Sequence, residues 1–138
     1  MNDWITGEAH RCLGCFDPPC QKACPASIPI PAFIRSIKSL NLQRAARTIR
    51  DANPMAATCG AVCPEDVLCQ PACTRGKIDR PIRIRELHSY ASRFEEPPSP
   101  GVSSKATPAG AGRVAVIGSG PAGLSCARTL AKALWERI

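Results

Sequence analysis

Hydrophobic and polar positions alternate with the spacing of an α-helix in three stretches of the chain. Apolar residues recur every three or four positions over 31–40, 42–52 and 81–94, and basic or polar residues occupy the positions between them. Pro31 suits the first position of the first helix, and Asn41 is a reasonable residue for its end. The first two helices are expected to pack as an antiparallel pair, so the pattern predicts a mainly α-helical fold.

The connecting segments contain many prolines and glycines, which interrupt regular structure. A short helical turn is expected over 8–13, and another over 55–63 before Pro64. Residues 65–73 are expected to form a loop and residues 74–81 a turn. Such segments allow a backbone to fold closely around a bound group.

The pattern changes after the third helix. Residues 96–112 lack periodicity and are rich in proline, glycine and serine, which is typical of a linker. The β-branched residues of 113–117 predict a short strand, and a helix is expected from Leu124 to about residue 134 after a glycine-rich loop. The sequence therefore predicts a helical domain, a linker and a truncated β-α unit, at residues 1–95, 96–112 and 113–138.

Composition and charge narrow the possible function classes. The formal net charge is +7, but the basic residues are spread along the chain, and only six residues are aromatic (two Trp, one Tyr and three Phe). Few aromatic side chains are available to stack on bases, so no nucleic-acid partner is expected. The first ten residues are polar rather than an apolar run, so neither a signal peptide nor a membrane span is expected. These features favour a cytoplasmic protein.

Eight of the nine cysteines fall into two groups of four. The groups read, in order, Cys12-x2-Cys15-x4-Cys20-x3-Cys24-Pro25 and Cys59-x3-Cys63-Pro64-x4-Cys69-x3-Cys73. Without an export signal, closely spaced cysteines indicate metal binding rather than disulfides. The helical domain also has few large apolar side chains, and small domains of this kind usually depend on a metal or on disulfides for stability.

The spacing of the first group resembles the bacterial ferredoxin run, in which three cysteines bind one iron–sulfur cluster and the fourth binds another. Paired Cys-x2–4-Cys knuckles, the usual pattern of a structural zinc site, fit less well. The same exchange predicts two clusters here, each with ligands from both groups. The first would take Cys12, Cys15, Cys20 and a distant cysteine, best Cys73. The second would take Cys24, Cys63, Cys69 and a fourth ligand that spacing does not fix.

The residues around these cysteines resemble a known family. Arg11-Cys12-Leu13 through Cys24-Pro25, and Cys59-Gly60 through Cys73, are similar to an N-terminal iron–sulfur domain found in two kinds of enzyme. These are the small (beta) subunit of NADPH-dependent glutamate synthase, and dihydropyrimidine dehydrogenase with its bacterial NAD-dependent relatives. The resemblance runs from about residue 8 to the end of the chain. It implies a helical domain of the α-helical ferredoxin type that holds two [4Fe-4S] clusters with exchanged ligands.

The fourth ligand of the second cluster is open between two residues. In the dihydropyrimidine dehydrogenase branch, the resemblance implies a glutamine on the helix after the last cysteine, and His88 occupies the matching position. Imidazole can bind iron, and it raises the potential of a cluster where it replaces thiolate. The alternative is Cys59, with His88 as a buried histidine satisfied by hydrogen bonds. We favour His88, because it occupies the position that the resemblance implies for the ligand; helical spacing also places it on the inward face of 81–94.

A glycine motif, Gly118-x-Gly120-x2-Gly123, lies between the expected strand and helix, where such a motif indicates dinucleotide binding. It is similar to the FAD-binding start of the same two families, so the resemblance implies FAD and NAD(P)H in a longer parent protein. The acidic residue that binds the ribose is expected about 20 residues further on, but only residues 124–138 follow. This chain alone is therefore not expected to hold FAD stably, and it is expected to be a fragment, a truncated product or one half of a split protein.

Together these features predict an iron–sulfur electron-transfer domain of an NAD(P)H-dependent flavoprotein oxidoreductase, which relays electrons between flavins. The expected partner is the remainder of the flavoprotein or a separate catalytic subunit, resembling the glutamate synthase large subunit or a pyrimidine dehydrogenase. No residue is a candidate acid, base or nucleophile, so this stretch alone is not expected to be catalytic. Two alternatives remain open: a zinc-stabilised interaction module without redox activity, and an independent small ferredoxin.

Overall fold

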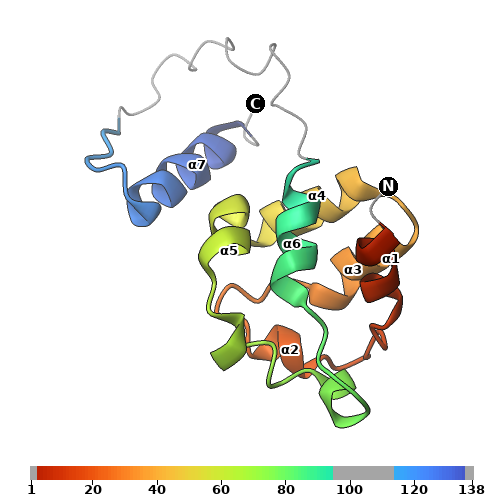
Figure 1. Ribbon diagram of the computed structural model, residues 1–138. Coiled ribbons are helices and arrows are strands. Elements are labelled where there is room, and N and C mark those ends of the chain that lie inside the picture. Colours follow the sequence, from red (N-terminus) through yellow and green to blue (C-terminus); the bar gives the residue numbers. More distant parts are fainter. Residues whose placement is uncertain (1–2, 95–113, 136–138) are drawn as a thin grey trace. The chain divides into compact units, whose positions relative to one another are not determined.

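The computed structural model describes residues 3–94 and 114–135, which fall into two compact units (Figure 1). The units span Met1–Glu95 and Glu96–Ile138, and each is described by itself. The predicted linker over 96–112 lies outside the described residues. None of the described helices is long and apolar enough to cross a membrane. The elements are α1 (Asp3–His10), α2 (Pro19–Lys22), α3 (Ile30–Lys38), α4 (Leu42–Ala52), α5 (Ala56–Val62), the 3-10 turns η1 (Glu65–Val67) and η2 (Thr74–Lys77), α6 (Ile84–Ser92) and α7 (Pro121–Trp135).

Helices α3 and α4 pack against each other, as the hydrophobic pattern predicts. Asn41, the residue expected at the end of the first helix, contributes to both helices. Its backbone N–H donates a hydrogen bond of 2.9 Å to the carbonyl of Ser36 in α3. Its side chain caps α4 by accepting a hydrogen bond of 2.9 Å from the backbone N–H of Arg44. The chain leaves α3 through Leu40, whose φ of 60° lies in the left-handed region and reverses the chain direction.

Helix α6 is the centre of the first unit, since it packs against α1, α3, α4 and α5. It begins at Ile84 and ends at Ser92, so it is shorter at both ends than the predicted stretch 81–94. The preceding residues, Ile82 and Arg83, donate their backbone N–H groups to side chains of distant segments. Long-range contacts therefore set the point at which this helix begins.

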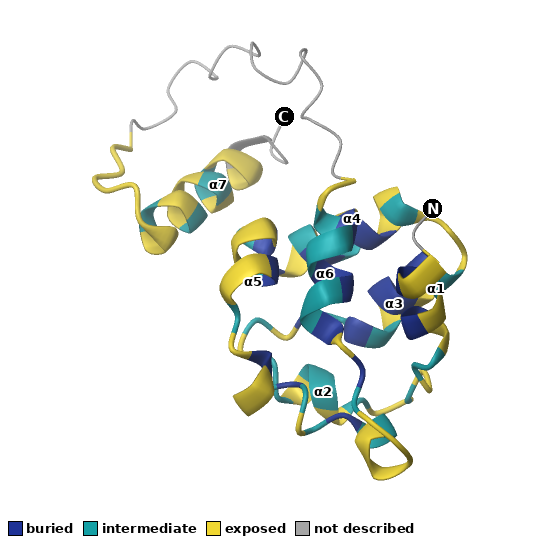
Figure 2. Ribbon diagram, in the orientation of Figure 1, coloured by how far each residue is buried: buried dark blue, intermediate teal, exposed yellow. Residues whose placement is uncertain are grey.

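Aliphatic side chains from these helices form the core. Figure 2 shows the buried residues in dark blue where α1, α3, α4 and α6 face one another. The largest fully buried side chains are Phe33, Ile34, Ile37, Ile49, Ile82 and Leu87. A single aromatic residue in this group leaves a small core, which agrees with a domain that depends on bound metal for its stability.

Helix α1 begins earlier than the short turn expected over 8–13 and replaces it. Gly7 lowers the intrinsic helix propensity of this stretch, which explains why the sequence pattern does not predict a helix before residue 8. Burial of Ile5 and Ala9 against the core stabilises the helix instead. The helix thereby delivers the chain directly to the first cysteine.

A buried carboxylate joins α1 to the segment that leads into α6. Glu8, with a side chain only 1% exposed, accepts hydrogen bonds from the guanidinium groups of Arg11 (2.8 Å) and Arg80 (2.9 Å) and from the backbone N–H of Arg83 (3.0 Å). Burial raises the pKa of Glu8, but these hydrogen bonds outweigh it and hold the pKa below its usual value. We call these four residues the Glu8 clamp.

In the second unit, helix α7 begins at Pro121 rather than at Leu124, because proline suits the first helical position. Of the strand expected over 113–117, the structure describes residues 114–117, and these form no strand. Residues 114–117 have no regular secondary structure, and the described part of the chain contains no other strand with which they could pair.

The glycine loop packs tightly onto the start of α7. Gly118 has a φ of 107°, which favours glycine. A Cβ at position 123 would lie 2.2 Å from the carbonyl oxygen of Gly118, so only glycine permits this approach. The carbonyl of Gly120 accepts a hydrogen bond of 3.0 Å from the backbone N–H of Leu124. The three predicted glycines therefore lie together where the loop meets the helix N-terminus.

Candidate metal centres

Eight cysteines lie at the ends of the short helices of the first unit and in the loops between them. All eight carry free thiols. We call them the frame cysteines: Cys12, Cys15, Cys20, Cys24, Cys59, Cys63, Cys69 and Cys73.

The first site consists of Cys12, Cys15, Cys20 and Cys73, the set predicted for the first cluster. Burial raises the pKa of Cys12, and the neighbouring thiols of Cys73 and Cys15 raise it further, although the ammonium group of Lys38 acts in the opposite sense. Burial also raises the pKa of Cys20 to about 11, with contributions from Cys73 and Cys12. The four thiols are therefore within electrostatic reach of one another, and a bound cation would relieve their repulsion as thiolates.

Hydrogen-bond donors approach the sulfurs of the first site. The thiol of Cys15 donates to the hydroxyl oxygen of Thr74 at 3.6 Å, and this hydroxyl can donate in turn when Cys15 is a thiolate. The backbone N–H of Ile82 donates to the sulfur of Cys73 at 3.5 Å. When a cysteine is a metal-bound thiolate, such donors stabilise its negative charge.

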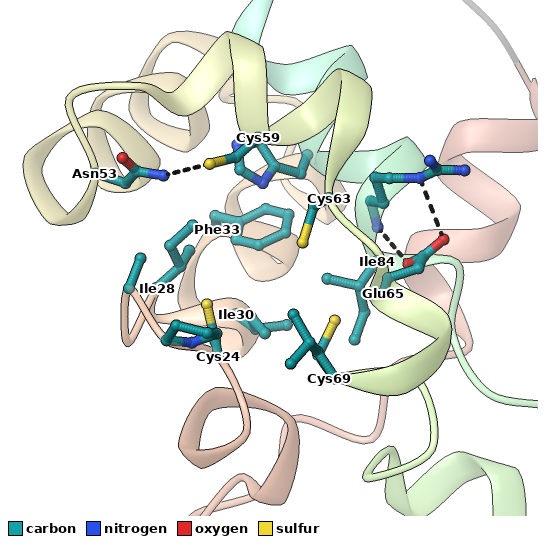
Figure 3. A pocket seen from close by; sticks show the side chains of 15 residues that line it. Cys24, Ile28, Ile30, Phe33, Asn53, Cys59, Cys63, Glu65, Cys69 and Ile84 are labelled. Carbon is teal, nitrogen blue, oxygen red and sulfur yellow. Dashed lines mark hydrogen bonds and ion pairs between the residues drawn. The ribbon is translucent and has the colours of Figure 1, made fainter. Parts of the chain in front are cut away.

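The second site is a cavity of about 140 Å³ with a largely apolar wall (Figure 3). The sulfurs of Cys24, Cys63 and Cys69 face the same space in this view. The thiol and imidazole groups that line the cavity belong to Cys24, Cys59, Cys63, Cys69 and His88. The apolar wall comes from Ile28, Ile30, Phe33 and Ile84. The cavity thus brings together every residue predicted for the second cluster, with both alternatives for its fourth ligand.

The thiols of the second site also influence one another. Burial raises the pKa of Cys69 to about 12, and the charges of Glu65, Cys63 and Cys24 raise it further. Cys20, of the first site, contributes in the same sense. The two sites therefore adjoin.

His88 lies on α6 and is only 6% exposed. Its imidazole donates a hydrogen bond to the backbone carbonyl of Ala56, while Nε2 is buried without a hydrogen-bond partner. Burial lowers the pKa of His88, which favours the neutral imidazole. A neutral ring with one nitrogen held by a carbonyl and the other free is the arrangement of a metal-binding histidine.

Cys59 has a different environment within the same cavity. The side-chain amide nitrogen of Asn53 donates to its sulfur at 3.0 Å, and the amide oxygen of Asn53 accepts from the backbone N–H of Met55 at 2.9 Å. Asn53 is 8% exposed, so its amide is fixed in one orientation. The sequence does not predict the hydrogen bond from Asn53 to Cys59, because Asn53-Pro54 indicates only the end of a helix.

The donors surround a volume rather than a single point. Among residues 3–94 and 114–135, no group of three or more His, Cys, Asp or Glu side chains converges closely enough to hold one metal ion. A structural zinc ion needs four ligands within about 2.0–2.3 Å of its centre. Thiolate and imidazole ligands spread around a cavity fit an iron–sulfur cluster, whose irons lie at separate corners.

Comparison with known protein families identifies the chemistry of these sites. The model of a family described as dihydropyrimidine dehydrogenase domain II, 4Fe-4S cluster, matches residues 2–98. The chain belongs to this family. It therefore carries an iron–sulfur electron-transfer domain of dihydropyrimidine dehydrogenase type, as its sequence predicts, and the family does not support the zinc alternative.

Curated relatives agree with this family. The chain is 46% identical over 123 residues to the NAD-dependent dihydropyrimidine dehydrogenase subunit PreT of Escherichia coli, and 46% identical over 128 residues to PreT of Salmonella typhimurium. It is 36% identical over 133 residues to the NADPH-Fe(3+) oxidoreductase subunit beta of Geobacter sulfurreducens. These matches cover 89%, 89% and 93% of this chain, but only 30%, 30% and 20% of the relatives. The chain thus spans less than a third of their length.

Proposed function

We propose that this domain holds two [4Fe-4S] clusters and relays electrons within an NAD(P)H-dependent flavoprotein oxidoreductase of dihydropyrimidine dehydrogenase type. The observation that carries the proposal is the pair of adjoining sites, each with at least four thiol or imidazole donors. Bound clusters would supply one-electron chemistry. The polypeptide contributes the ligands, the short separation of the two sites and the charges around them.

The ligand sets of the two clusters are part of this proposal. Cys12, Cys15, Cys20 and Cys73 would hold the first cluster, and Cys24, Cys63, Cys69 and His88 the second. The short helix α2 supports this exchange, because it carries Cys20 of the first site and leads directly to Cys24 of the second. Cys69 and Cys73 are related in the same way along the chain.

The free Nε2 of His88 favours this residue over Cys59 as the fourth ligand. A buried ring nitrogen without a partner is costly, and iron would satisfy it. The sulfur of Cys59 accepts an amide hydrogen bond from Asn53, which fits either role, so the unpartnered imidazole nitrogen decides the assignment. We therefore assign Cys59 to the wall of the cavity rather than to the cluster.

The second unit is proposed to be the start of an FAD-binding domain in a longer parent protein. The close contact of Gly118 with Gly123 gives the loop the shape in which backbone N–H groups can approach a pyrophosphate. The strand of such a domain would form only when further strands are present to pair with it. FAD and NAD(P)H would then belong to the parent protein.

The proposed partner is the remainder of that flavoprotein or a separate catalytic subunit. Each relative described above is named as a subunit, which supports an assembly of several chains. A pyrimidine dehydrogenase-like subunit is the favoured partner, and a glutamate synthase-like subunit is the other candidate from the resemblance. The proposed location is the cytoplasm.

The experiment that tests the relay is a measurement of iron, inorganic sulfide and zinc on protein purified without oxygen, with EPR of the reduced state. About eight irons and eight sulfides per chain, with a reduced-state signal, are expected for two clusters. Zinc without inorganic sulfide would refute the proposal.

The fourth ligand is tested by the variants His88→Ala and Cys59→Ala. We expect His88→Ala to alter the EPR signal and potential of one cluster, whereas Cys59→Ala leaves both clusters unchanged. The reverse result would assign the ligand to Cys59.

A further inference from the structure

Glu65 is a buried acid beside the second site. It lies in η1 directly after Cys63-Pro64, is 7% exposed, and lines the same cavity as Cys63 and Cys69 (Figure 3). A buried carboxylate is costly unless it is paired or hydrogen-bonded. A negative charge next to anionic thiolates adds repulsion to that cost, so its position calls for a specific role.

The carboxylate of Glu65 is held in place by Arg85. One oxygen accepts a hydrogen bond of 2.8 Å from the backbone N–H of Arg85, in the first turn of α6. The other lies 3.7 Å from the side-chain Nε of Arg85. The dashed lines at Glu65 in Figure 3 mark these two contacts. They fix the charge relative to α6, the helix that also carries His88.

The carboxylate of Glu65 lies beside the sulfurs of the second site. Glu65 is two residues after Cys63 and lines the cavity that Cys63 and Cys69 also line, so its charge acts on any group held there. The side chain of Arg85 is 40% exposed and that of Glu65 only 10%, so solvent screens the cation more strongly than the carboxylate.

We propose that Glu65 is a fixed negative charge that lowers the reduction potential of the second cluster and compensates for the neutral imidazole of His88. This inference rests on the proposed two-cluster function. Three thiolates and one imidazole carry one negative charge fewer than four thiolates, and Glu65 supplies a negative charge nearby. Adding an electron to a cluster is less favourable beside a fixed anion, so the potential falls.

The test is an EPR-monitored redox titration of the cluster-loaded chain, comparing Glu65→Gln with Asp66→Asn. Glutamine keeps an oxygen that can accept from the Arg85 N–H, so the substitution removes the charge but not the hydrogen bond. Asp66 is the next residue and is exposed, so its substitution makes the same change in net charge where solvent screens it. We expect Glu65→Gln to shift the potential of one cluster to more positive values, by clearly more than Asp66→Asn, and to leave the other cluster unchanged.

A second variant tests the sign of the effect. Arg85→Gln removes the opposing cation but leaves the backbone N–H that binds Glu65, so we expect the potential of the same cluster to become more negative. If Glu65→Gln binds less iron than the wild type, the potential measured for Arg85→Gln still tests the inference. Equal shifts in Glu65→Gln and Asp66→Asn, or a positive shift in Arg85→Gln, would overturn the inference. Because wild-type iron and sulfide are measured first, such a result is distinct from failure of the two-cluster proposal.

Discussion

The two candidate metal sites use the same cysteine chemistry but are supported by different parts of the fold. The first lies among loops and is held by polar groups, including Lys38, Thr74 and the Glu8 clamp. The second is a cavity with an apolar wall, closed by helices α3, α5 and α6. One set of ligands can therefore be positioned by charge pairs and another by helix packing within a single small domain. It follows that each site should respond to changes in its own support.

Loss of a cysteine proposed as a cluster ligand should have the largest effect and should affect one site only. We expect Cys69→Ser to lower the iron content from about eight to about four per chain, because the second cluster loses a thiolate. Cys20→Ser should have the same effect on the first cluster. EPR of the two variants should show complementary signals, and simultaneous loss of both signals in either variant would show that the sites are not independent.

The next largest effect is expected at the Glu8 clamp. Replacing Glu8 by glutamine removes the charge that pairs with Arg11 and Arg80. Because Arg80 is 54% exposed and Arg11 keeps its ion pair with Asp79, we expect a loss of about 2 kcal/mol. Denaturant unfolding under anaerobic conditions measures this loss. The EPR signal of the first cluster should broaden more than that of the second. Asp51→Asn, at an exposed position of α4, is the control and should change stability by less than about 0.5 kcal/mol.

Gly60→Ala should disturb the second site through helix packing. A Cβ at Gly60 would lie 2.9 Å from the Cα of Ser89, so α5 and α6 must separate, at a cost of about 1–3 kcal/mol. Cys59 in α5 and Cys63 directly after it would then shift relative to His88, and the EPR signal of the second cluster should change alone. Gly7→Ala is the matched control, because a Cβ there meets nothing within 4 Å. It should stabilise α1 by about 0.5–1 kcal/mol, and equal losses in both variants would argue against the packing explanation.

The smallest effect is expected at Thr74. Replacing it by valine removes the hydroxyl beside the sulfur of Cys15 without changing the size of the side chain. A hydrogen bond worth about 1 kcal/mol corresponds to roughly 40 mV for one electron, and its loss should lower the potential of the first cluster. Redox titration measures the shift. Thr74→Ser should retain the wild-type potential, and an equal shift in serine and valine variants would exclude the hydroxyl as the cause.

The local patterns of the sequence predict much of this architecture. The helix over 42–52 has clear apolar spacing and a proline beyond its end, and the structure reproduces its limits. This prediction depends on residues close in sequence, for which chain geometry leaves few alternatives. The cysteine spacing predicts donors shared between the two groups, and Cys24 of the first group lines the same cavity as Cys63 and Cys69 of the second. The assignment of these donors to two clusters stays a prediction.

The contacts that differ from the prediction, or are missing from it, depend on distant residues. The sequence predicts Asn41 only as the end of one helix, and its additional role as the cap of the next is seen only in the three-dimensional turn. Glu8 and Glu65 look like ordinary surface acids, because their partners come from residues 80–85. The strand expected over 113–117 fails for the same reason, since a strand forms only with a neighbour to pair with.

The Glu8 clamp also has a consequence for the order of biosynthesis. Glu8 and the first cysteines leave the ribosome early, but Arg80 and Arg83 are translated only after all eight frame cysteines. Helix α1 therefore lacks its anchor until α6 begins to emerge, since domains fold as units during synthesis. Cluster insertion at the first site should consequently follow translation of the whole helical domain, and a nascent chain stalled before Arg80 should be a poor acceptor of iron and sulfide.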